Sequence, residues 1–280
     1  MSNYHDLPAL GSTDIKNLLK SDSGRNFLDG RQKEFKSSSM SFGTMCHCML
    51  LEPDQFDERY AVYRGGKTRA SADFKEFQAE HDGKEIVKTE EYEAAYELLK
   101  DLKDAPAILS AEKEFEVFGK TNGVEIKAKL DAVKIADDKK TAICFDLKTG
   151  HDVIKRWSYS VNDFGYHLQQ YHYRLCLSQL LGVTIDSIRF IFILAERSTG
   201  YVQLVELDEH TEQIASHQHA QAIEKYKAMC KRLERTQETV AQFPRQQVPA
   251  FDLSKITTRG LPEFVIARFQ RGRDQNEQKL

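Results

Sequence analysis

Two aspartates and one lysine near the middle of the chain form a set that can do metal-assisted chemistry. Asp131 lies a short distance before Asp146-Leu147-Lys148. Hard divalent cations prefer oxygen ligands, and such a cation can neutralise a phosphate and activate a water. If Asp146 and Lys148 lie on a strand, they share one face roughly 7 Å apart, which brings an ammonium beside the attacking water. The spacing therefore predicts phosphodiester hydrolysis.

The same tripeptide has an ordinary interpretation, because Asp-x-Lys is common and most instances are surface ion pairs of little energetic worth. The pairing of the surrounding segments favours the site. Residues 112–117 and 126–131 alternate in polarity, and 141–147 form a third expected strand. A hairpin register brings Asp131 and Asp146 together. Lys127 and Lys129 alternate onto the face of Asp131, where they are expected to contact phosphate.

Helices are expected on both sides of these strands. Apolar spacing and stop signals predict helices over 12–19, 41–51, 90–103, 165–181 and 209–237, and further strands over 188–195 and 201–207. The polar stretch 64–85 is predicted to be mobile. The order indicates an α+β fold with one mixed sheet. We expect a single domain over 1–280, with a helical part (1–110), a core (111–210) and a long helix with a basic tail (211–280).

Two further segments carry residue types that suit a metal site. Phe42 to Pro53 reads FGTMCHCMLLEP, with His47 between two cysteines, and residues 166–169 read YHLQ, followed by Tyr173. Adjacent helical residues point about 100° apart, so Cys46, His47 and Cys48 cannot converge on one ion. Gln169 and Tyr173 share one helix face. We expect buried thiols that flank a functional His47, although a core histidine is the competing interpretation.

Together these segments resemble a known family. Asp131 with Asp146-Leu147-Lys148 looks like the PD-(D/E)xK nuclease core, and the flanking segments resemble the helices of RecE-like exonucleases, the exonuclease VIII type. Residues 195–201 resemble the strand pair that follows, so the likeness covers roughly residues 7–210. It implies a restriction-endonuclease-like core with N-terminal helical additions. No proline precedes Asp131, which is a common departure.

The resemblance also implies roles for single residues. Asp131, Asp146 and His47 would hold Mg²⁺, for which Mn²⁺ can substitute, and Lys148 would orient water. Gln169 and Tyr173 would face the active site. Glu112 falls where the family often places an acidic residue, although a solvated stripe of glutamates (Glu112, Glu114, Glu116) explains it equally well.

The implied activity is that of an exodeoxyribonuclease. It would degrade the 5′ strand of linear double-stranded DNA to 5′-phosphomononucleotides and leave 3′ single-stranded tails for recombination by strand annealing. The implied partners are a single-strand annealing protein of the RecT type and further copies of the chain, which would form a trimeric or tetrameric ring around DNA.

The composition fits this expectation when the charged residues are counted separately for the C-terminal segment and for the rest of the chain. The net charge is −3, but residues 225–280 carry 12 basic and 6 acidic residues, against 28 and 37 in the remainder. A carboxylate-rich body with a basic end suits an enzyme that binds metal and holds phosphates elsewhere. Arg64, Lys67 and Arg69 form a further candidate DNA contact. Five cysteines without a CxxC pair argue against a disulfide framework, and with no membrane span or secretory signal we expect a cytoplasmic protein.

Two alternatives stay open at this point. One is another RecB-family nuclease, such as a Cas4-like end-trimming enzyme, although the four cysteines of a Cas4 cluster are not present in the sequence. The other is a DNA-binding module without catalysis, against which Asp131, Asp146 and Lys148 all argue.

Overall fold

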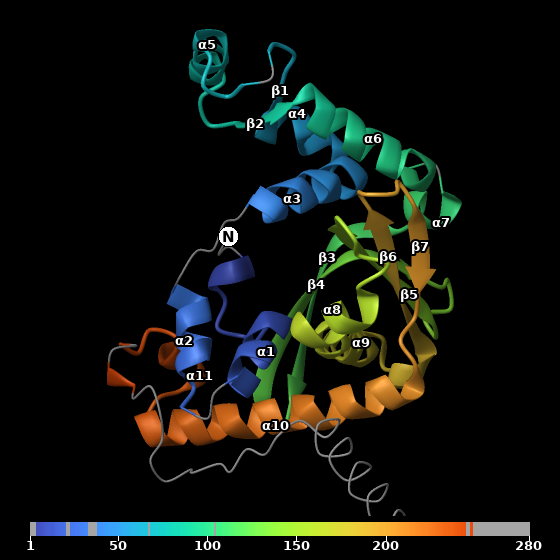
Figure 1. Cartoon of the computed structure of the whole chain (residues 1–280). Coiled ribbons are helices and arrows are strands. Elements are labelled where there is room, and N and C mark those ends of the chain that lie inside the picture. The colour runs from blue at the N-terminus through green and yellow to red at the C-terminus, as the bar shows by residue number, and fades with distance from the viewer. Residues whose placement is uncertain are drawn as a thin grey trace, which may run out of the picture.

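The computed structural model describes residues 4–20, 23–32, 38–66, 68–103, 105–244 and 247–248 (Figure 1). The strands are β1 (Tyr60–Tyr63), β2 (Glu85–Lys88), β3 (Glu112–Thr121), β4 (Val124–Ile135), β5 (Ala142–Gly150), β6 (Ile188–Glu196) and β7 (Val202–Val205). The α-helices are α1 (Ser12–Lys20), α2 (Arg25–Gln32), α3 (Ser38–Leu51), α4 (Phe56–Arg59), α5 (Ala72–Glu80), α6 (Thr89–Lys103), α7 (Pro106–Leu109), α8 (Trp157–Asp163), α9 (Tyr166–Leu181), α10 (Glu209–Leu233) and α11 (Gln237–Val240). Short 3-10 turns cover Tyr4–Asp6, Pro53–Gln55 and Ile185–Ser187.

A five-stranded mixed sheet forms the centre of the molecule, in the order β3-β4-β5-β6-β7. The strands β3, β4 and β5 form an antiparallel meander. β6 returns parallel to β5 through α8 and α9, and β7 pairs antiparallel with β6. This arrangement confirms the predicted α+β fold with a mixed sheet. The parallel connection from β5 to β6 matters for the site, because it places the start of α9 beside the end of β5.

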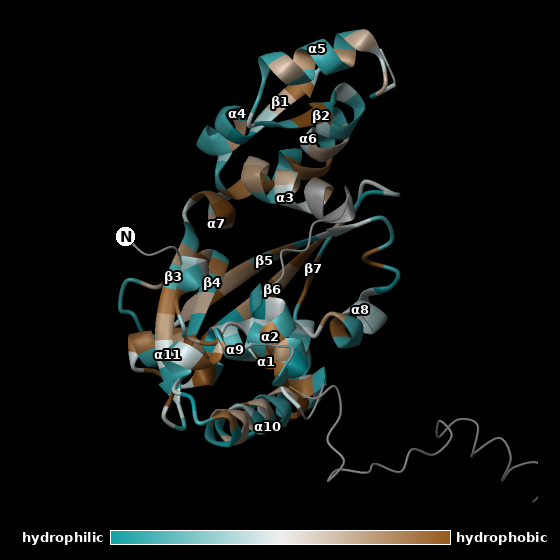
Figure 2. Ribbon diagram, turned by 90° about the vertical axis from the view of Figure 1, so that its left-hand side faces the viewer, coloured by the Kyte–Doolittle hydropathy of each residue, from teal (hydrophilic) through white to brown (hydrophobic). Residues whose placement is uncertain are grey.

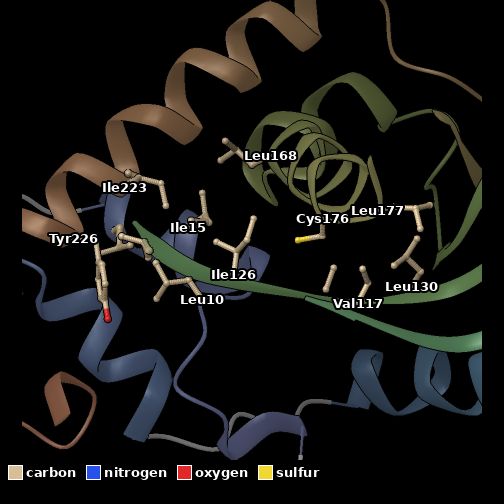
Figure 3. Packing of buried hydrophobic residues seen from close by; sticks show 14 of the residues in the cluster. Leu10, Ile15, Val117, Ile126, Leu130, Leu168, Cys176, Leu177, Ile223 and Tyr226 are labelled. Atoms are coloured by element: carbon tan, nitrogen blue, oxygen red, sulfur yellow. The ribbon is translucent and has the colours of Figure 1, made fainter. Parts of the chain in front are cut away.

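One face of the sheet packs against α1, α9 and α10. Its core includes Ile126 and Leu130 of the sheet, Leu168 of α9 and Tyr226 of α10 (Figure 3). Alternation in β4 places Ile126, Ala128 and Leu130 on this face. α9 begins after Gly165 and ends at Gly182, and both glycines adopt the left-handed backbone (φ 64° and 67°). The end of α9 agrees with the sequence-based prediction.

The other face of the sheet is covered by α3 and α6. Leu147, Ile193 and Ala195 point to this side, where they pack with Met45 and Leu99 of the two helices. Figure 2 shows β5 largely in the hydrophobic colour between the helical layers. Helix α3 approaches β5 closely at Gly43, where an added Cβ would lie 3.1 Å from the Thr149 hydroxyl. The glycine therefore lets the helix bring its polar residues to the end of the sheet.

The stretch predicted to be mobile, 64–85, contains ordered structure instead. β1 and β2 form a small parallel sheet, and α5 packs on it through Phe74, which contacts Tyr63. Ser71 caps α5 by accepting a hydrogen bond from the Phe74 amide. The strands have four residues each, which is too short for an alternation pattern to be recognised. This small unit lies at the far end of the molecule from α10 (Figure 1).

The segment between β5 and α9 contains α8. Within the described ranges, no helix combines the length and apolar character that a bilayer crossing requires.

Candidate active site

The two aspartates lie opposite each other on neighbouring strands. β4 and β5 pair from Ile135↔Ala142 to Ala132↔Phe145, and the same register continued by one residue sets Asp131 beside Asp146. Regular pairing ends there, and the Leu147 amide instead donates to Asp131 Oδ2 at 2.9 Å. On the other side of Asp131, Glu114 of β3 adopts φ 50°, which is unusual for a residue other than glycine. The sheet is thus irregular where the carboxylates meet.

Asp146 is held in one orientation by two donors. Its side chain is 1% exposed, and both carboxylate oxygens accept hydrogen bonds from Lys148 Nζ, at 2.5 and 2.7 Å. Gln169 of α9 donates to the same two oxygens at 3.1 and 3.3 Å. A buried carboxylate is stable only when it is paired and hydrogen-bonded, and both conditions hold here. Gln169 therefore lies against the carboxylate of Asp146.

Lys148 remains a cation in this environment. Burial lowers the pKa of its amine, but the charges of Asp146 and Asp131 outweigh burial and leave the pKa above its usual value. The amine also lies 4.7 Å from the centre of the Tyr166 ring. A protonated lysine can donate hydrogen bonds and stabilise negative charge, but it cannot accept a proton from water.

His47 extends from α3 toward the same carboxylates. Its Nε2 lies 2.9 Å from the carbonyl oxygen of Leu147, and its Nδ1 lies 3.3 Å from Asp131 Oδ2. Because a carbonyl only accepts, Nε2 must carry the hydrogen, and in the neutral ring Nδ1 then presents its lone pair to Asp131. Two acceptors that face each other require a proton or a cation between them. The ring is one-third exposed, whereas Cys46 and Cys48 beside it are buried, so His47 is not a core residue.

The pKa of the Asp131 carboxyl is raised in this arrangement. Burial, and next the negative charge of Asp146, raise the pKa of Asp131 to about 6. His47, Lys148 and the Leu147 amide act in the opposite direction but do not compensate. A carboxylate of this kind gains stability from a bound cation.

The donor set fits a hard or borderline divalent cation, although it is not a preformed cage. Within the described part of the chain, no group of three or more His, Cys, Asp or Glu side chains is already arranged around a metal position. Both oxygens of Asp146 are turned toward Lys148. Asp131, Asp146 and the Nδ1 atom of His47 would hold the ion, after a small movement of the Lys148 amine from the carboxylate. Such a set of oxygens with one imidazole suits Mg²⁺ and Mn²⁺.

An open cleft of about 1120 Å³ leads to these groups. His47 and Lys148 lie in its wall, and Lys129 and Arg156 bring further positive charge to it. Acidic residues balance this charge, because Glu52, Glu114, Asp152 and Asp163 also line the cleft and Lys129 pairs with Glu114 at 2.5 Å. The other lining residues are Gly43, Thr44, Cys48, Glu52, Arg59, Leu147, Thr149, Gly150, His151, Asp152, Val153, Ser160, Asp163, Phe164 and Tyr166. The cleft is large enough to admit a nucleotide chain.

Two of the predicted site residues have other roles. Lys127 was expected to contact phosphate, but it is 4% exposed and donates to the carbonyl oxygens of Tyr4 and Leu7, at 2.6 and 2.9 Å. The prediction failed because alternation specifies a face but not what covers it, and here the N-terminal segment covers it. Glu112 was a candidate ligand, but it is exposed and does not line the cleft, whereas Glu114 does.

The basic residues near the start of the small β1–β2 unit are not part of the cleft lining. Arg64 is exposed, and Arg69 pairs with Glu91 at 3.0 Å. Lys67 lies outside the described residues. Their contact with DNA remains a prediction.

Several other notable side chains are structural. His167 bonds the Val161 carbonyl and Gln218, and Trp157 stacks on Tyr166 at 5.5 Å. Tyr173 lies beside the site, where burial raises its pKa, as do the charges of Asp146 and Asp131, so it stays neutral.

Two contributors were not found from the sequence. Glu196 ends β6 with its carboxylate buried, and it accepts hydrogen bonds from the amides of Ile154 and Lys155. It thereby fixes the loop that carries the cleft wall after β5. Lys16 of α1 lies near Asp146 and Lys148, and burial and then Lys148 lower its pKa to about 8. An acidic residue at a strand end is the signal that could have identified Glu196, whereas nothing in α1 marks Lys16.

Comparisons with known proteins agree with this architecture. The family described as "PDDEXK-like domain of unknown function (DUF3799)" matches residues 11–240. A crystal structure named "Putative exonuclease", from Eubacterium rectale, superposes with a TM-score of 0.56 at 15% identity and covers 92% of each chain. A second structure, SSO0001, reaches a TM-score of only 0.29 at 16% identity, over 74% of this chain and 84% of that one, and carries no argument. No curated protein matches the sequence significantly.

Proposed function

Since this chain belongs to the PDDEXK-like domain family, and so to the PD-(D/E)xK nuclease superfamily, we propose that it is a metal-dependent exodeoxyribonuclease acting on linear duplex DNA. The observation that carries the proposal is the convergence of Asp131, Asp146, His47 and Lys148 beside an open cleft, whose wall includes His47 and Lys148. The name of the Eubacterium rectale protein supports an exonuclease as the kind of nuclease.

A divalent cation bound here would neutralise charge on the scissile phosphate and lower the pKa of water. The residues of the chain supply the remaining functions. Lys148, as a cation, donates to the attacking water and to the oxygen on which negative charge develops. Gln169 keeps the Asp146 carboxylate oriented when Lys148 moves away from it. The Leu147 carbonyl fixes the tautomer of His47, so that Nδ1 keeps a lone pair for the ion.

The finer features of the proposal follow the RecE-like resemblance. The enzyme would degrade the 5′ strand and leave 3′ single-stranded tails, which a RecT-type annealing protein would bind. A trimeric or tetrameric ring would keep the enzyme on DNA.

The experiment is digestion of one sequence in linear, nicked and covalently closed forms, with Mg²⁺ or with chelator. We expect Mg²⁺-dependent loss of linear DNA, with mononucleotides as products and resistance of closed circles. Labels on the 5′ and 3′ ends of separate samples identify the degraded strand. Cleavage of closed circles would instead indicate an endonuclease, and metal-dependent binding without products would indicate an inactive DNA-binding module. Release of short single-stranded fragments would favour an end-trimming enzyme.

A further inference from the structure

A second cleft adjoins the first and shares one wall with it. It measures about 630 Å³, and Asp163, Phe164 and Tyr166 line both clefts. Phe164 connects α8 to α9 and is 58% exposed. This aromatic side chain therefore stands on the ridge between the cleft lined by His47 and Lys148 and the second cleft.

The ridge has a rigid base. Phe164 lies 5.6 Å from Tyr166, which stacks on Trp157 with an interplanar angle of 19°. After Phe164 the chain turns through Gly165, which adopts φ 64°. A Cβ at that position would lie 2.7 Å from the side chain of Lys16, so a glycine is needed for α1 and α9 to approach each other. The fold thus holds an apolar ring at an exposed position instead of burying it.

The second cleft has the chemistry of a phosphate-binding surface. Lys16 and Lys20 of α1 line it, together with neutral polar residues such as Asn17 and Asn162, and the acidic Asp163 lies on the ridge itself. Lys20 contacts Asn17 at 3.2 Å. Among the described residues, the Lys16 amine has no carboxylate partner within ion-pair distance, and burial and then Lys148 lower its pKa to about 8. An anion in the cleft would stabilise this cation.

We propose that Phe164 separates the two strands at a duplex end: the hydrolysed strand enters the first cleft, whose wall includes His47 and Lys148, and phosphates of the other strand bind Lys16 and Lys20 in the second cleft. The proposal rests on the proposed nuclease function. Two clefts that share a ridge suit two diverging strands, and an aromatic ring can stack on a terminal base of any sequence. Lysines recognise the backbone without sequence preference.

Strand separation can be measured without cleavage. A blunt duplex carries 2-aminopurine at its terminal pair, and its fluorescence is followed as protein is added in EDTA. We expect fluorescence to rise with the wild type and not with Phe164→Ala, whereas Phe164→Trp retains the rise. Tyr201→Ala removes another exposed aromatic ring, 70% exposed and outside both clefts, and serves as the matched control. No rise with the wild type, or an unchanged rise with Phe164→Ala, overturns the proposal.

Kinetics give an independent measure. The ratio of the rate on blunt duplex to the rate on a single strand should fall roughly tenfold in Phe164→Ala, given the strength of base stacking on aromatic rings. A forked duplex with unpaired ends should restore the ratio. Lys16→Gln with Lys20→Gln should weaken duplex binding and flatten its dependence on salt. An unchanged ratio, or an unchanged salt dependence, contradicts the corresponding part of the proposal.

The outcomes distinguish this proposal from the nuclease function itself. If the wild type digests duplex and the ratio does not change, only the separation of strands is wrong. If the wild type digests no DNA in Mg²⁺ or Mn²⁺ but opens the terminal pair in EDTA, the nuclease proposal fails and the ridge stands as part of a DNA-binding site.

Discussion

Nδ1 of His47, on α3, lies 3.3 Å from Oδ2 of Asp131, on β4, while the opposite ring nitrogen is fixed by the carbonyl of Leu147. The contact joins the helical layer to the sheet at the end of the cleft. With Nε2 protonated, Nδ1 and Oδ2 both act as acceptors, so a proton or a cation must lie between the two atoms. The same geometry therefore links metal binding to protonation.

The first prediction concerns His47 as a ligand. His47→Ala should lower Mn²⁺ affinity roughly 10- to 100-fold, because an imidazole donor is lost and the carboxylates alone hold the ion. Titration calorimetry measures the affinity, and His81→Ala, in the small β1–β2 unit, is the control. Crystals soaked in Mn²⁺ should show anomalous density beside Nδ1. Density surrounded only by carboxylates and water would remove His47 from the ligand set.

The second prediction concerns stability. The folded-state pKa of Asp131, about 6, is above its usual 3.8, so between these pH values the folded protein binds more protons than the unfolded chain. The contribution of this group to the free energy of unfolding is therefore fully present below pH 3.8 and is lost as pH rises through about 6. At pH 7 without metal, Asp131→Asn should raise the free energy of unfolding by on the order of 1 kcal/mol.

Calorimetric melting in EDTA tests this, with Asp137→Asn in an exposed turn as the control. Added Mg²⁺ should reverse the order, because only the wild type keeps its ligand. If the variant melts below the wild type in EDTA at pH 7, the charge of Asp131 does not destabilise the folded state.

The third prediction concerns the acid side of the activity profile. A protonated Asp131 cannot serve as a ligand, so activity should fall as pH decreases through about 6. Because metal and proton compete for the same oxygens, raising Mn²⁺ should move this decline to lower pH. Rates measured across pH at two metal concentrations give the answer, and a decline at the same pH in both would assign it to another group.

The fourth prediction separates catalysis from stability at Asp146 and Lys148. Each single replacement, Asp146→Asn or Lys148→Met, should lower kcat by a factor of roughly 100 or more. Lys148→Met also leaves the Asp146 carboxylate buried with Gln169 as its remaining described partner, which should cost about 3–5 kcal/mol. Lys148→Met should therefore lower stability as well as activity.

The double variant is the decisive measurement for the pair. Asp146→Asn with Lys148→Met has no uncompensated charge, so it should melt well above Lys148→Met while remaining inactive. A double variant that is as unstable as Lys148→Met would mean that shape, rather than charge, determines the loss. Recovery of activity in either single variant would end the assignment of this pair to the chemistry.

Lys127 and Lys129 show where prediction of the site from the sequence reaches its limit. Both lie on the expected strand, yet the first is buried beneath the N-terminal segment and the second pairs with Glu114 in the cleft. Period-2 alternation specifies which face a residue shares but not which distant segment covers that face. Asp131 and Asp146 were predictable because strand pairing is local, whereas Lys16 depends on how α1 packs against α9.

The last prediction concerns assembly. A closed ring multiplies the hold on the DNA backbone by the number of subunits, and it does not require each subunit to be basic. Sedimentation should therefore give three or four times 32.2 kDa. Truncation tests the basic end, but cutting after Gln242 would remove Phe243 and the buried Val248, which pack on the core. Truncation after Val248 is the cleaner change.

Truncation after Val248 removes 6 basic and 4 acidic residues and should make retention on DNA more sensitive to salt, with Mn²⁺ affinity unchanged. Competition with unlabelled DNA across salt concentrations measures the retention. A stable monomer that degrades closed circles as fast as linear DNA would refute the ring, yet it would leave the metal site intact, because His47, Asp131, Asp146 and Lys148 all come from one chain.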